Sequence, residues 1–429
     1  MTPEPQTPNP EPQPHDAIIV GAGPGGATAA AFLAEQGRRV LLLDKSTFPR
    51  DKVCGDAISG KSVDVLRRLG LVDRVMQTKQ VGSWGVTFGG PYGDEVAIPF
   101  TKELDKPVPP GFVCAREVFD QVLFEKAVQA GADVRQGVTV KRLLREEGRV
   151  TGVEVEQPSP RKQPPSPIPH PPSLYHAPLV IGADGAYSVV AREVGMQQLD
   201  ERHYCAGLRA YYTGVTGFHP LNHVELHFVD EAIPGYFWIF PMADGRANVG
   251  IGMLSRAIKR KDVRLKEVLA ACIRHPRFRE RFEGAEQIGP VRGWGLPLGS
   301  KPRPMAGDGW MLLGDAASLI DPFTGEGIGN AMISGELAAK WTSKAKTEND
   351  YTAAFLHGYE RDVLDYLQGE LRLSHAMQRL IGWKWLLNAV IRKASRSAEL
   401  ADAISCMFDD ESQRRKLVSP LFYLRVLAA

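Results

Sequence analysis

Residues 16–44, DAIIVGAGPGGATAAAFLAEQGRRVLLLD, decide the fold. The stretch begins with a short apolar run that is typical of a buried parallel strand. It then passes through a glycine-rich turn into an Ala-rich helix and ends in a second apolar strand. In such a unit, Gly21 allows the tight turn, Gly23 lets a pyrophosphate approach the backbone, and Gly26 lets helix and strand pack closely.

The ends of the helix and of the second strand point to a ligand. A helix N-terminus presents free N–H groups and a partial positive charge to phosphates. Asp44 follows the glycines by about 20 residues, where a carboxylate can bind both hydroxyls of a ribose. The stretch therefore predicts a dinucleotide-binding fold, and by itself it leaves FAD and NAD(P) both open.

Composition narrows the class of protein. The chain has 429 residues, is 43% hydrophobic and 24% charged, and has a formal net charge of +2. These values are typical of an α/β protein with two or three packed regions, and they do not indicate nucleic-acid binding. The five cysteines lack CxxC spacing, which argues against a disulfide framework or a structural zinc site. We therefore expect a cytoplasmic protein without a metal site. No apolar run in the sequence reaches the ~18 residues needed to span a bilayer.

Pattern and composition also suggest a division into domains. Alternating residues predict a hairpin over 84–100 and an antiparallel sheet between 204 and 253, followed by a helix over 262–273 with Asp262 as its N-cap. The expected domains are a disordered Pro-rich tail (1–15), the first part of the nucleotide-binding domain (16–200) with a Pro-rich surface insert (157–178), an antiparallel-sheet substrate domain (201–300), a return segment of the nucleotide-binding domain (301–345), and a helical C-terminal region (346–429).

A second motif joins GWMLLGDAA (309–317) to DPFTGEGIGNA (321–331). Asp315 at a strand tip can bind a polyol hydroxyl. The N–H groups near Gly327 and Ile328 begin a helix that can face the pyrimidine edge of a flavin and stabilise negative charge in the reduced ring. Pro322 belongs to the same turn. The alternative is a plain strand–turn–helix crossover.

A third motif, LVIGADGAYSVVAR (179–192), again carries a buried strand into Asp-Gly before a helix. Asp184 either orients backbone groups near a pyrophosphate or caps the helix N-terminus. Both roles stay open from the residues alone.

Together the three motifs resemble the flavoprotein superfamily that contains para-hydroxybenzoate hydroxylase. The GxGxxG, GADGxxSxVAR and GDAA…P…GEGI segments occur in the order of that family and span most of residues 16–340. The resemblance implies FAD at the first motif and no separate nicotinamide domain. The expected fold class is α/β, with a Rossmann-like FAD-binding domain built on a parallel sheet, an antiparallel-sheet substrate domain and a helical C-terminal region.

Two further segments resemble geranylgeranyl reductases within that superfamily. FPRDKVCGDAIS (48–59) is similar to their PxxKxCG segment, which related monooxygenases and halogenases also carry, and PGYFWIFP (234–241) is similar to their YxWxFP motif, which lines the lipid cavity. Arg116 suits the family's pyrophosphate contact, because a guanidinium at a helix start can reach that group, and Val140 would act through its backbone at the adenine. The cofactor-binding residues that we expect from motifs and resemblance together are Gly21, Gly23, Gly25, Gly26, Asp44, Lys45, Cys54, Gly55, Ala57, Arg116, Val140, Asp184, Asp315, Pro322, Gly327 and Ile328.

Three residues are candidates for catalysis: Cys54, Tyr236 and Trp238. Tyr236, Trp238 and Phe240 alternate on one strand face, where they either pack in the core or wall a long apolar pocket that excludes water and stabilises a developing carbocation. Cys54 is either a proton donor or redox thiol, or a small residue that lets the backbone approach the flavin. The lack of an obviously paired His or second Cys favours the small-residue role.

The C-terminal region suggests contact with a membrane. Residues 377–393 and 414–429 combine Trp, Leu and Phe with Lys and Arg, a pattern that suits a lipid surface. The alternative is packing on the core or at a dimer interface. We expect a cytoplasmic location, peripheral at the inner face of the membrane.

These expectations combine into one function. The resemblance implies an FAD-dependent oxidoreductase that reduces C=C bonds of a polyprenyl (geranylgeranyl-type) chain by hydride transfer from reduced flavin N5, with NAD(P)H or a ferredoxin-like protein as electron donor. An isoprenoid lipid is the expected partner and nucleic acid is not. The alternatives are an aromatic or polyketide monooxygenase that uses a C4a-hydroperoxide, and a membrane-associated flavin electron carrier. A halogenase is disfavoured, because no clear WxWxIP tryptophan pair with its lysine is visible.

Overall fold

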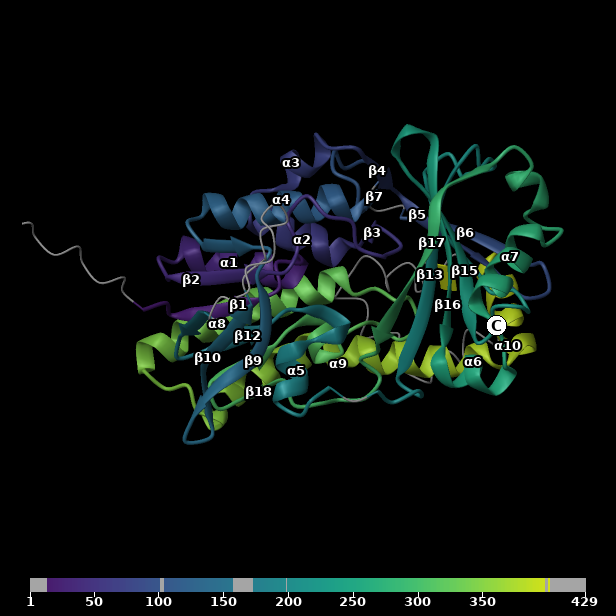
Figure 1. Ribbon diagram of the computed structural model, residues 1–429. Coiled ribbons are helices and arrows are strands. Elements are labelled where there is room, and N and C mark those ends of the chain that lie inside the picture. The colour runs from purple at the N-terminus through teal and green to yellow at the C-terminus, as the bar shows by residue number, and fades with distance from the viewer. Residues whose placement is uncertain (1–13, 101–103, 157–172, 198, 398–399, 402–429) are drawn as a thin grey trace, which may run out of the picture.

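Two large sheets and a long helix organise the molecule. The computed structural model describes residues 14–100, 104–156, 173–197, 199–397 and 400–401. Figure 1 shows a parallel sheet on the left and a second sheet on the right. The long helix α9 (Ala353–Ile381) starts beside the first sheet and leads to α10 (Lys384–Ala394) beside the second.

The first sheet has six strands and is parallel from β19 to β8, with β18 antiparallel at one edge. Its central strands are buried along their whole length, as expected for a parallel sheet covered on both faces. The predicted parallel sheet is confirmed. In spatial order the strands are β18 (Ala306–Gly307), β19 (Trp310–Leu312), β12 (Val180–Gly182), β1 (Ala17–Val20), β2 (Val40–Asp44) and β8 (Asp133–Gln136).

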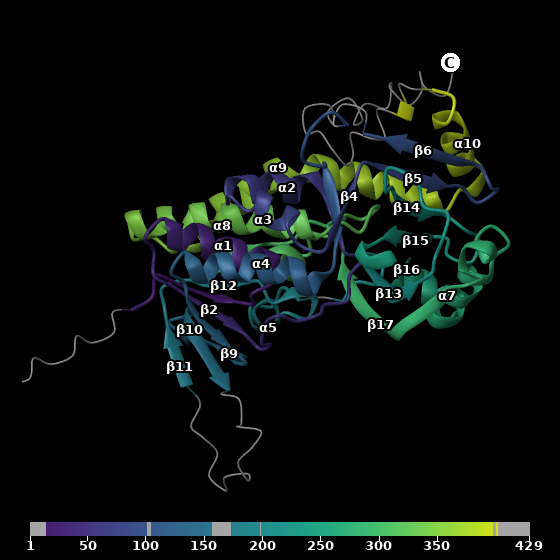
Figure 2. The same cartoon turned by 90° about the horizontal axis from the view of Figure 1, so that it is seen from above.

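Helices cover one face of this sheet. Figure 2 shows α1 (Pro24–Glu35), α4 (Arg116–Gln129) and α8 (Ile328–Glu348) on one side and a small three-stranded sheet on the other. Both α4 and α8 pack against α1. The shorter helices of this part are α2 (Gly60–Arg68), which packs against α8, α3 (Val72–Met76) and α5 (Val189–Glu193).

The small sheet corrects the expected insert. It consists of β9 (Thr139–Glu146), β10 (Arg149–Glu156) and β11 (Ser173–His176), with β11 antiparallel to β10. A surface loop over 157–178 is therefore wrong for the four residues of β11, and residues 157–172 lie outside the described part of the chain. Residues 173–176 form a strand because they pair with β10, and the Pro-rich composition around them gave no sign of this pairing.

The second sheet has seven strands and is antiparallel except where β14 and β5 run parallel. The predicted hairpin over 84–100 is confirmed, with Gly90 N donating to Asp94 O across its turn at 2.7 Å. It belongs to this sheet, however, so a boundary at residue 200 does not separate the strands of the two sheets. The order is β17 (Glu286–Pro297), β13 (Tyr204–Thr213), β16 (Arg246–Leu254), β15 (Gly235–Pro241), β14 (Val224–His227), β5 (Gly85–Gly89) and β6 (Glu95–Pro99).

One face of the second sheet packs against two helices, α6 (Ser255–Lys261) and α7 (Leu265–Arg274). Phe237 and Ile239 of β15 share a core with α7. The predicted helix over 262–273 is wrong at its start, because Asp262 ends α6 with a left-handed φ of +50°. Arg264 precedes the first turn of α7.

A third layer lies between the large sheets and consists of β3 (Ala57–Ile58), β7 (Gly111–Cys114) and β4 (Gln80–Ser83) (Figure 1). The backbone N–H of Cys114 on β7 donates to Asp56 O at 2.9 Å and so holds the end of the loop that precedes β3, residues 50–56. Among the described residues, no helix combines the length and the apolar character that crossing a bilayer requires.

Candidate active site

A cavity lies where the two sheets meet, and two different walls enclose it. The seven-stranded sheet contributes mainly apolar side chains: Leu208, Val224, Leu226, Tyr236, Trp238, Phe240 and Leu296. The facing wall comes from the loop before β3, from α4 and from the segments that follow β1 and β19. Its main members are Pro24, Lys52, Cys54, Gly55, Ala57, Arg116, Asp315, Gly327 and Ile328.

The alternation predicted for β15 is confirmed, since Tyr236, Trp238 and Phe240 all line this cavity. Their ring centroids are 6.2 Å apart in each successive pair, so the three rings form one continuous aromatic surface. The phenol of Tyr236 donates a hydrogen bond to the carbonyl of Thr324, in the turn before α8. Burial raises the pKa of Tyr236, so the hydroxyl stays neutral and anchored.

Cys54 lines the cavity as a free thiol. Burial raises the pKa of its Sγ, and the charge of Arg116 only partly offsets this effect. At neutral pH the group is therefore a protonated thiol, not a thiolate nucleophile. A neutral thiol is compatible with a proton donor or a small residue under a ring, and it disfavours the redox thiol that was the other expected role of Cys54.

The glycine-rich turn after β1 has the geometry of a phosphate cradle. Gly21 has a φ of +101°, and a Cβ on Gly26 would lie 1.8 Å from the carbonyl oxygen of Gly21. A Cβ on Gly25 would lie 2.9 Å from the carbonyl oxygen of Ala331. At Gly23 the nearest atom to such a Cβ is Nη2 of Arg50 at 3.6 Å, so this backbone is open to a ligand.

The expected adenosine end lies along β2 and β9. Each oxygen of the Asp44 carboxylate accepts a backbone hydrogen bond at 2.7 Å, from Ala22 and from Ser46. Lys45 beside it is exposed, and Val140 is buried on β9. None of these residues lines the cavity. Asp44 ends β2 at the carboxyl edge of the parallel sheet, along which an extended dinucleotide would continue, whereas Val140 belongs to the small sheet.

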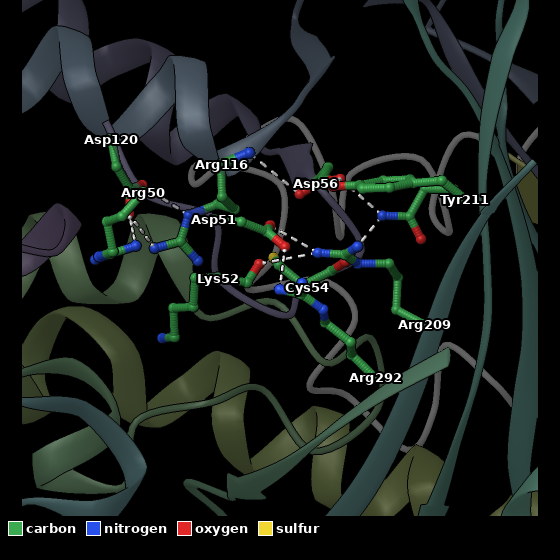
Figure 3. A network of polar contacts seen from close by, with 11 residues as sticks. Arg50, Asp51, Lys52, Cys54, Asp56, Arg116, Asp120, Arg209, Tyr211 and Arg292 are labelled. Atoms are coloured by element: carbon green, nitrogen blue, oxygen red, sulfur yellow. Dashed lines mark hydrogen bonds and ion pairs between the residues drawn. The ribbon is translucent and has the colours of Figure 1, made fainter. Parts of the chain in front are cut away.

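Arg116 is held in a buried ion pair at the start of α4. Its Nε and Nη2 each donate to Asp120 at 2.7 Å, and Arg50 reaches the same carboxylate at 2.8 Å (Figure 3). Burial alone would raise the pKa of Asp120, but the two guanidinium groups hold it below its usual value. Two cations around one anion leave a net positive charge beside the cavity, which suits a phosphate-bearing ligand.

The second motif also contributes to the cavity. Lys52 Nζ lies 3.3 Å from Asp315 Oδ2. Gly327 is the N-cap residue of the 21-residue helix α8, and Ile328 is its first residue. Because both line the cavity, the positive end of this helix dipole faces the interior. The open glycine backbone and this helix end fit FAD.

Two predicted cofactor residues have other contacts. Asp184 accepts hydrogen bonds from Ser188 Oγ and from the backbone N–H of Val189 and Val190, so its carboxylate caps the start of α5. Pro322 is buried, and its carbonyl accepts a hydrogen bond from Gln378 Nε2 at 2.7 Å. Neither residue lines the cavity, and their places in FAD binding stay predictions.

Several polar residues near the cavity were missed from the sequence. Arg209, only 3% exposed, contacts Asp51 at 2.8 Å, and Arg292 contacts the other oxygen of Asp51 at 2.9 Å (Figure 3). Asp56 and Asn248 are fully buried beside them. The available signal was a polar residue inside an apolar strand, such as Arg209 in YCAGLRAYYT.

Comparison with known proteins agrees with this geometry. The fold and site define an FAD-dependent oxidoreductase. A family model described as an FAD binding domain matches residues 15–361, and the chain belongs to this family, among its geranylgeranyl reductase flavoproteins.

Relatives and a solved structure make the likeness specific. A menaquinone reductase of Mycobacterium tuberculosis is 33% identical over 347 residues, 76% of each chain. Digeranylgeranylglycerophospholipid reductase 2 of Methanopyrus kandleri is 33% identical over 349 residues, covering 80% of this chain and 81% of the relative. The crystal structure of a geranylgeranyl bacteriochlorophyll reductase-like protein from Thermoplasma acidophilum has a TM-score of 0.79 and 25% identity, covering 97% and 98% of the two chains. A flavin-dependent brominase, with a TM-score of 0.73 and 20% identity over 96% and 99% of the chains, shares the fold.

Proposed function

We propose that this oxidoreductase saturates C=C bonds in a polyprenyl chain. The observation that carries the proposal is the shared cavity, in which an apolar aromatic wall faces the segments that fit FAD. An apolar aromatic wall of this kind excludes water and suits a hydrophobic chain as the second ligand of the cavity. The relative named digeranylgeranylglycerophospholipid reductase supports an isoprenoid substrate.

The chemistry divides between the cofactor and the chain. Reduced FAD, when bound, supplies a hydride from N5 to one alkene carbon, and a proton is added to the other carbon. Isolated alkenes are poor hydride acceptors, so the alignment of one double bond matters more than acid strength. The π faces of Trp238 and Tyr236 would stabilise positive charge as it develops on the alkene, in a cavity that excludes water.

The proton would come from Cys54, a tyrosine or water. The thiol of Cys54 remains protonated at neutral pH because burial raises its pKa, so it retains a proton to give. The Tyr236 hydroxyl donates to Thr324 O and would have to break that hydrogen bond first. This contrast favours Cys54 or water over Tyr236.

The electron donor in the proposal is NAD(P)H or a ferredoxin-like protein. Each donor can be added to the flavin-loaded protein under anaerobic conditions. Loss of the yellow flavin colour with one donor and not with the other would identify it.

Lipid analysis of expressing cells tests the proposal. Cells that produce the protein should accumulate prenyl lipids heavier by two hydrogens per reduced bond, as seen by mass spectrometry. Cells that produce Asp315→Ala, which should not hold FAD, are the matched control. An oxygenated product would support the monooxygenase alternative, and reversible flavin reduction without any lipid change would support the electron carrier.

We also propose that α10 contacts a membrane surface from which the lipid enters. Trp383 and Trp385 are 61% and 65% exposed, and Tyr92, 63% exposed, is joined to the same helix through Asn388. Arg392 is exposed on α10, and Lys384 begins it. Aromatic rings beside cations suit a headgroup layer. The segment 414–429, which was expected to act likewise, lies outside the described residues.

A further inference from the structure

A buried chain of hydrogen bonds runs behind the cavity and joins its two walls. The indole Nε1 of Trp238 donates to Asn248 Oδ1 at 2.8 Å. The Asn248 amide donates at 2.8 Å both to the carbonyl of Cys54 and to Asp56 Oδ2. Tyr211 donates to the same Asp56 oxygen at 2.7 Å (Figure 3). Trp238 and Cys54 line the cavity, whereas Asn248 and Asp56 lie fully buried behind them.

The orientation of the Asn248 amide follows from its partners. An indole N–H can only donate, so the amide oxygen must face Trp238. A backbone carbonyl and a carboxylate oxygen act here as acceptors, so the amide nitrogen must face Cys54 and Asp56. Both amide hydrogens and the oxygen are used. No other uncharged side chain of this length offers one acceptor and two donors, and an apolar replacement would leave several buried groups unpaired.

The Trp238 ring is also fixed from below. Trp238 on β15 pairs with Gly250 on β16, and a Cβ on Gly250 would lie 2.2 Å from Trp238 Cζ2. The indole therefore lies directly on the glycine backbone. A Cβ on Gly55 would lie 3.1 Å from Phe240 Cε2, so the loop that carries Cys54 touches the same aromatic surface. Both the face and the N–H edge of the indole are held.

We propose that Asn248 is a positioning residue that fixes the indole of Trp238 relative to the Cys54–Gly55 backbone, and so sets the aromatic wall against which one prenyl double bond must lie. The inference rests on the proposed function, which identifies FAD and a prenyl chain as the two ligands of the cavity. Asn248 acts through Trp238 and touches neither ligand. A displaced indole would still admit the prenyl chain but would hold the double bond out of line, and the loss would appear in kcat more than in KM.

The test is a double-mutant cycle on the flavin-loaded protein, with geranylgeranyl diphosphate as the probe. Trp238→Phe keeps an aromatic ring and removes the indole N–H, and Asn248→Ala removes the partner. Each single variant should lower kcat by roughly tenfold or more with a smaller change in KM. Because Asn248→Ala already breaks the link that Trp238→Phe removes, the double variant should be little worse than Asn248→Ala alone. Effects that multiply would overturn the inference.

Trp341→Phe is the matched control. Trp341 is 8% exposed, like Trp238, and its indole N–H donates to Asp362 at 2.9 Å, between α8 and α9. This variant should leave kcat and KM unchanged. If Asn248→Ala fails to fold, the comparison of Trp238→Phe with Trp341→Phe still decides, because an unchanged kcat in Trp238→Phe contradicts the proposal.

A spectroscopic readout separates this inference from the proposed function. Adding geranylgeranyl diphosphate to the oxidised holoprotein should change the flavin absorption spectrum, and Trp238→Phe and Asn248→Ala should alter the shape of that change in the same way. If the unmodified protein shows neither a spectral response nor turnover, the proposed function fails. If the unmodified protein responds and turns over while the two variants behave as it does, the positioning role fails.

Discussion

The ammonium of Lys52 lies 3.3 Å from the carboxylate of Asp315, although 263 positions separate them in the chain. The contact joins the loop before β3 to the residues that follow β19, at the edge of the cavity. Both side chains keep some exposure, 24% for Lys52 and 12% for Asp315. Asp315 is therefore oriented by one partner while an oxygen remains available to a ligand.

Asp315→Ala should give colourless protein, because a ribityl hydroxyl of FAD would lose its acceptor and Lys52 would lose its counter-charge. The ratio of flavin absorbance to protein absorbance after purification measures this loss. Asp365→Ala, at an exposed position on α9, should keep the colour. Yellow protein with full flavin occupancy in Asp315→Ala would contradict the assignment.

Asp56→Asn should remove a pH dependence from stability. Burial raises the pKa of Asp56 to about 6 from 3.8, and its hydrogen bonds and nearby cations only partly offset this. Because the folded-state pKa is raised, protonated Asp56 favours folding fully below pH 3.8, and that contribution is lost as pH rises through 6. The difference is about 3 kcal/mol. The titratable groups that face it are Tyr211, Arg209, Arg116, Cys54 and Cys114.

Denaturant unfolding of both proteins between about pH 4 and pH 7 checks this prediction. The free energy of unfolding of the unmodified protein should fall relative to that of Asp56→Asn as pH rises. Asparagine also tolerates the left-handed φ of +65° at this position. A constant difference between the two proteins over this range would show that Asp56 does not titrate there.

Gly26→Ala should destabilise the fold, because the new Cβ would lie 1.8 Å from the carbonyl oxygen of Gly21 and backbone must shift. We expect a loss of about 1–3 kcal/mol in the free energy of unfolding, with weaker FAD binding. Gly369→Ala in helix α9 is the control, since a Cβ there would meet no atom within 4 Å outside its own stretch of helix backbone. That variant should gain about 0.5–1 kcal/mol. Equal free energies of unfolding for Gly26→Ala and the unmodified protein would contradict the close approach of Gly26 to the Gly21 carbonyl.

Replacing Trp383 and Trp385 together by Ser should weaken binding to vesicles that contain anionic phospholipid, because the two exposed rings would no longer enter the headgroup layer. Cosedimentation with phosphatidylglycerol vesicles measures the effect. Leu199→Ser, at a position 73% exposed before β13, controls for a general loss of surface hydrophobicity. Unchanged cosedimentation would point to another role for α10, such as contact with a second protein.

The elements that local pattern predicts best are those that determine the cofactor site. Glycines, apolar runs and strand-end acids occur within short windows of sequence. Such windows therefore predict β1, α1 and β2, and they also predict the alternation of Tyr236 and Trp238. The same kind of window predicted the helix that begins near Gly327 and Ile328, which are the N-cap and the first residue of α8.

The contacts that sequence did not predict are long-range. The hairpin β5–β6 joins a sheet whose other strands follow residue 200, through a parallel pairing with β14 that no local signal encodes. The strand β17 is largely exposed and does not alternate, so its sequence shows no strand period. Asn248 acquires its role only because β16 lies beside β15 and behind the Cys54 loop.

Anaerobic single turnover tests the central claim most directly. The purified protein is reduced with dithionite in the absence of oxygen, excess reductant is removed, and a geranylgeranyl lipid is added. The account predicts that the yellow colour of oxidised flavin returns and that mass spectrometry finds the lipid heavier by two hydrogens per reduced bond. Flavin that stays reduced until oxygen is admitted, with an unchanged or oxygenated lipid, would contradict it.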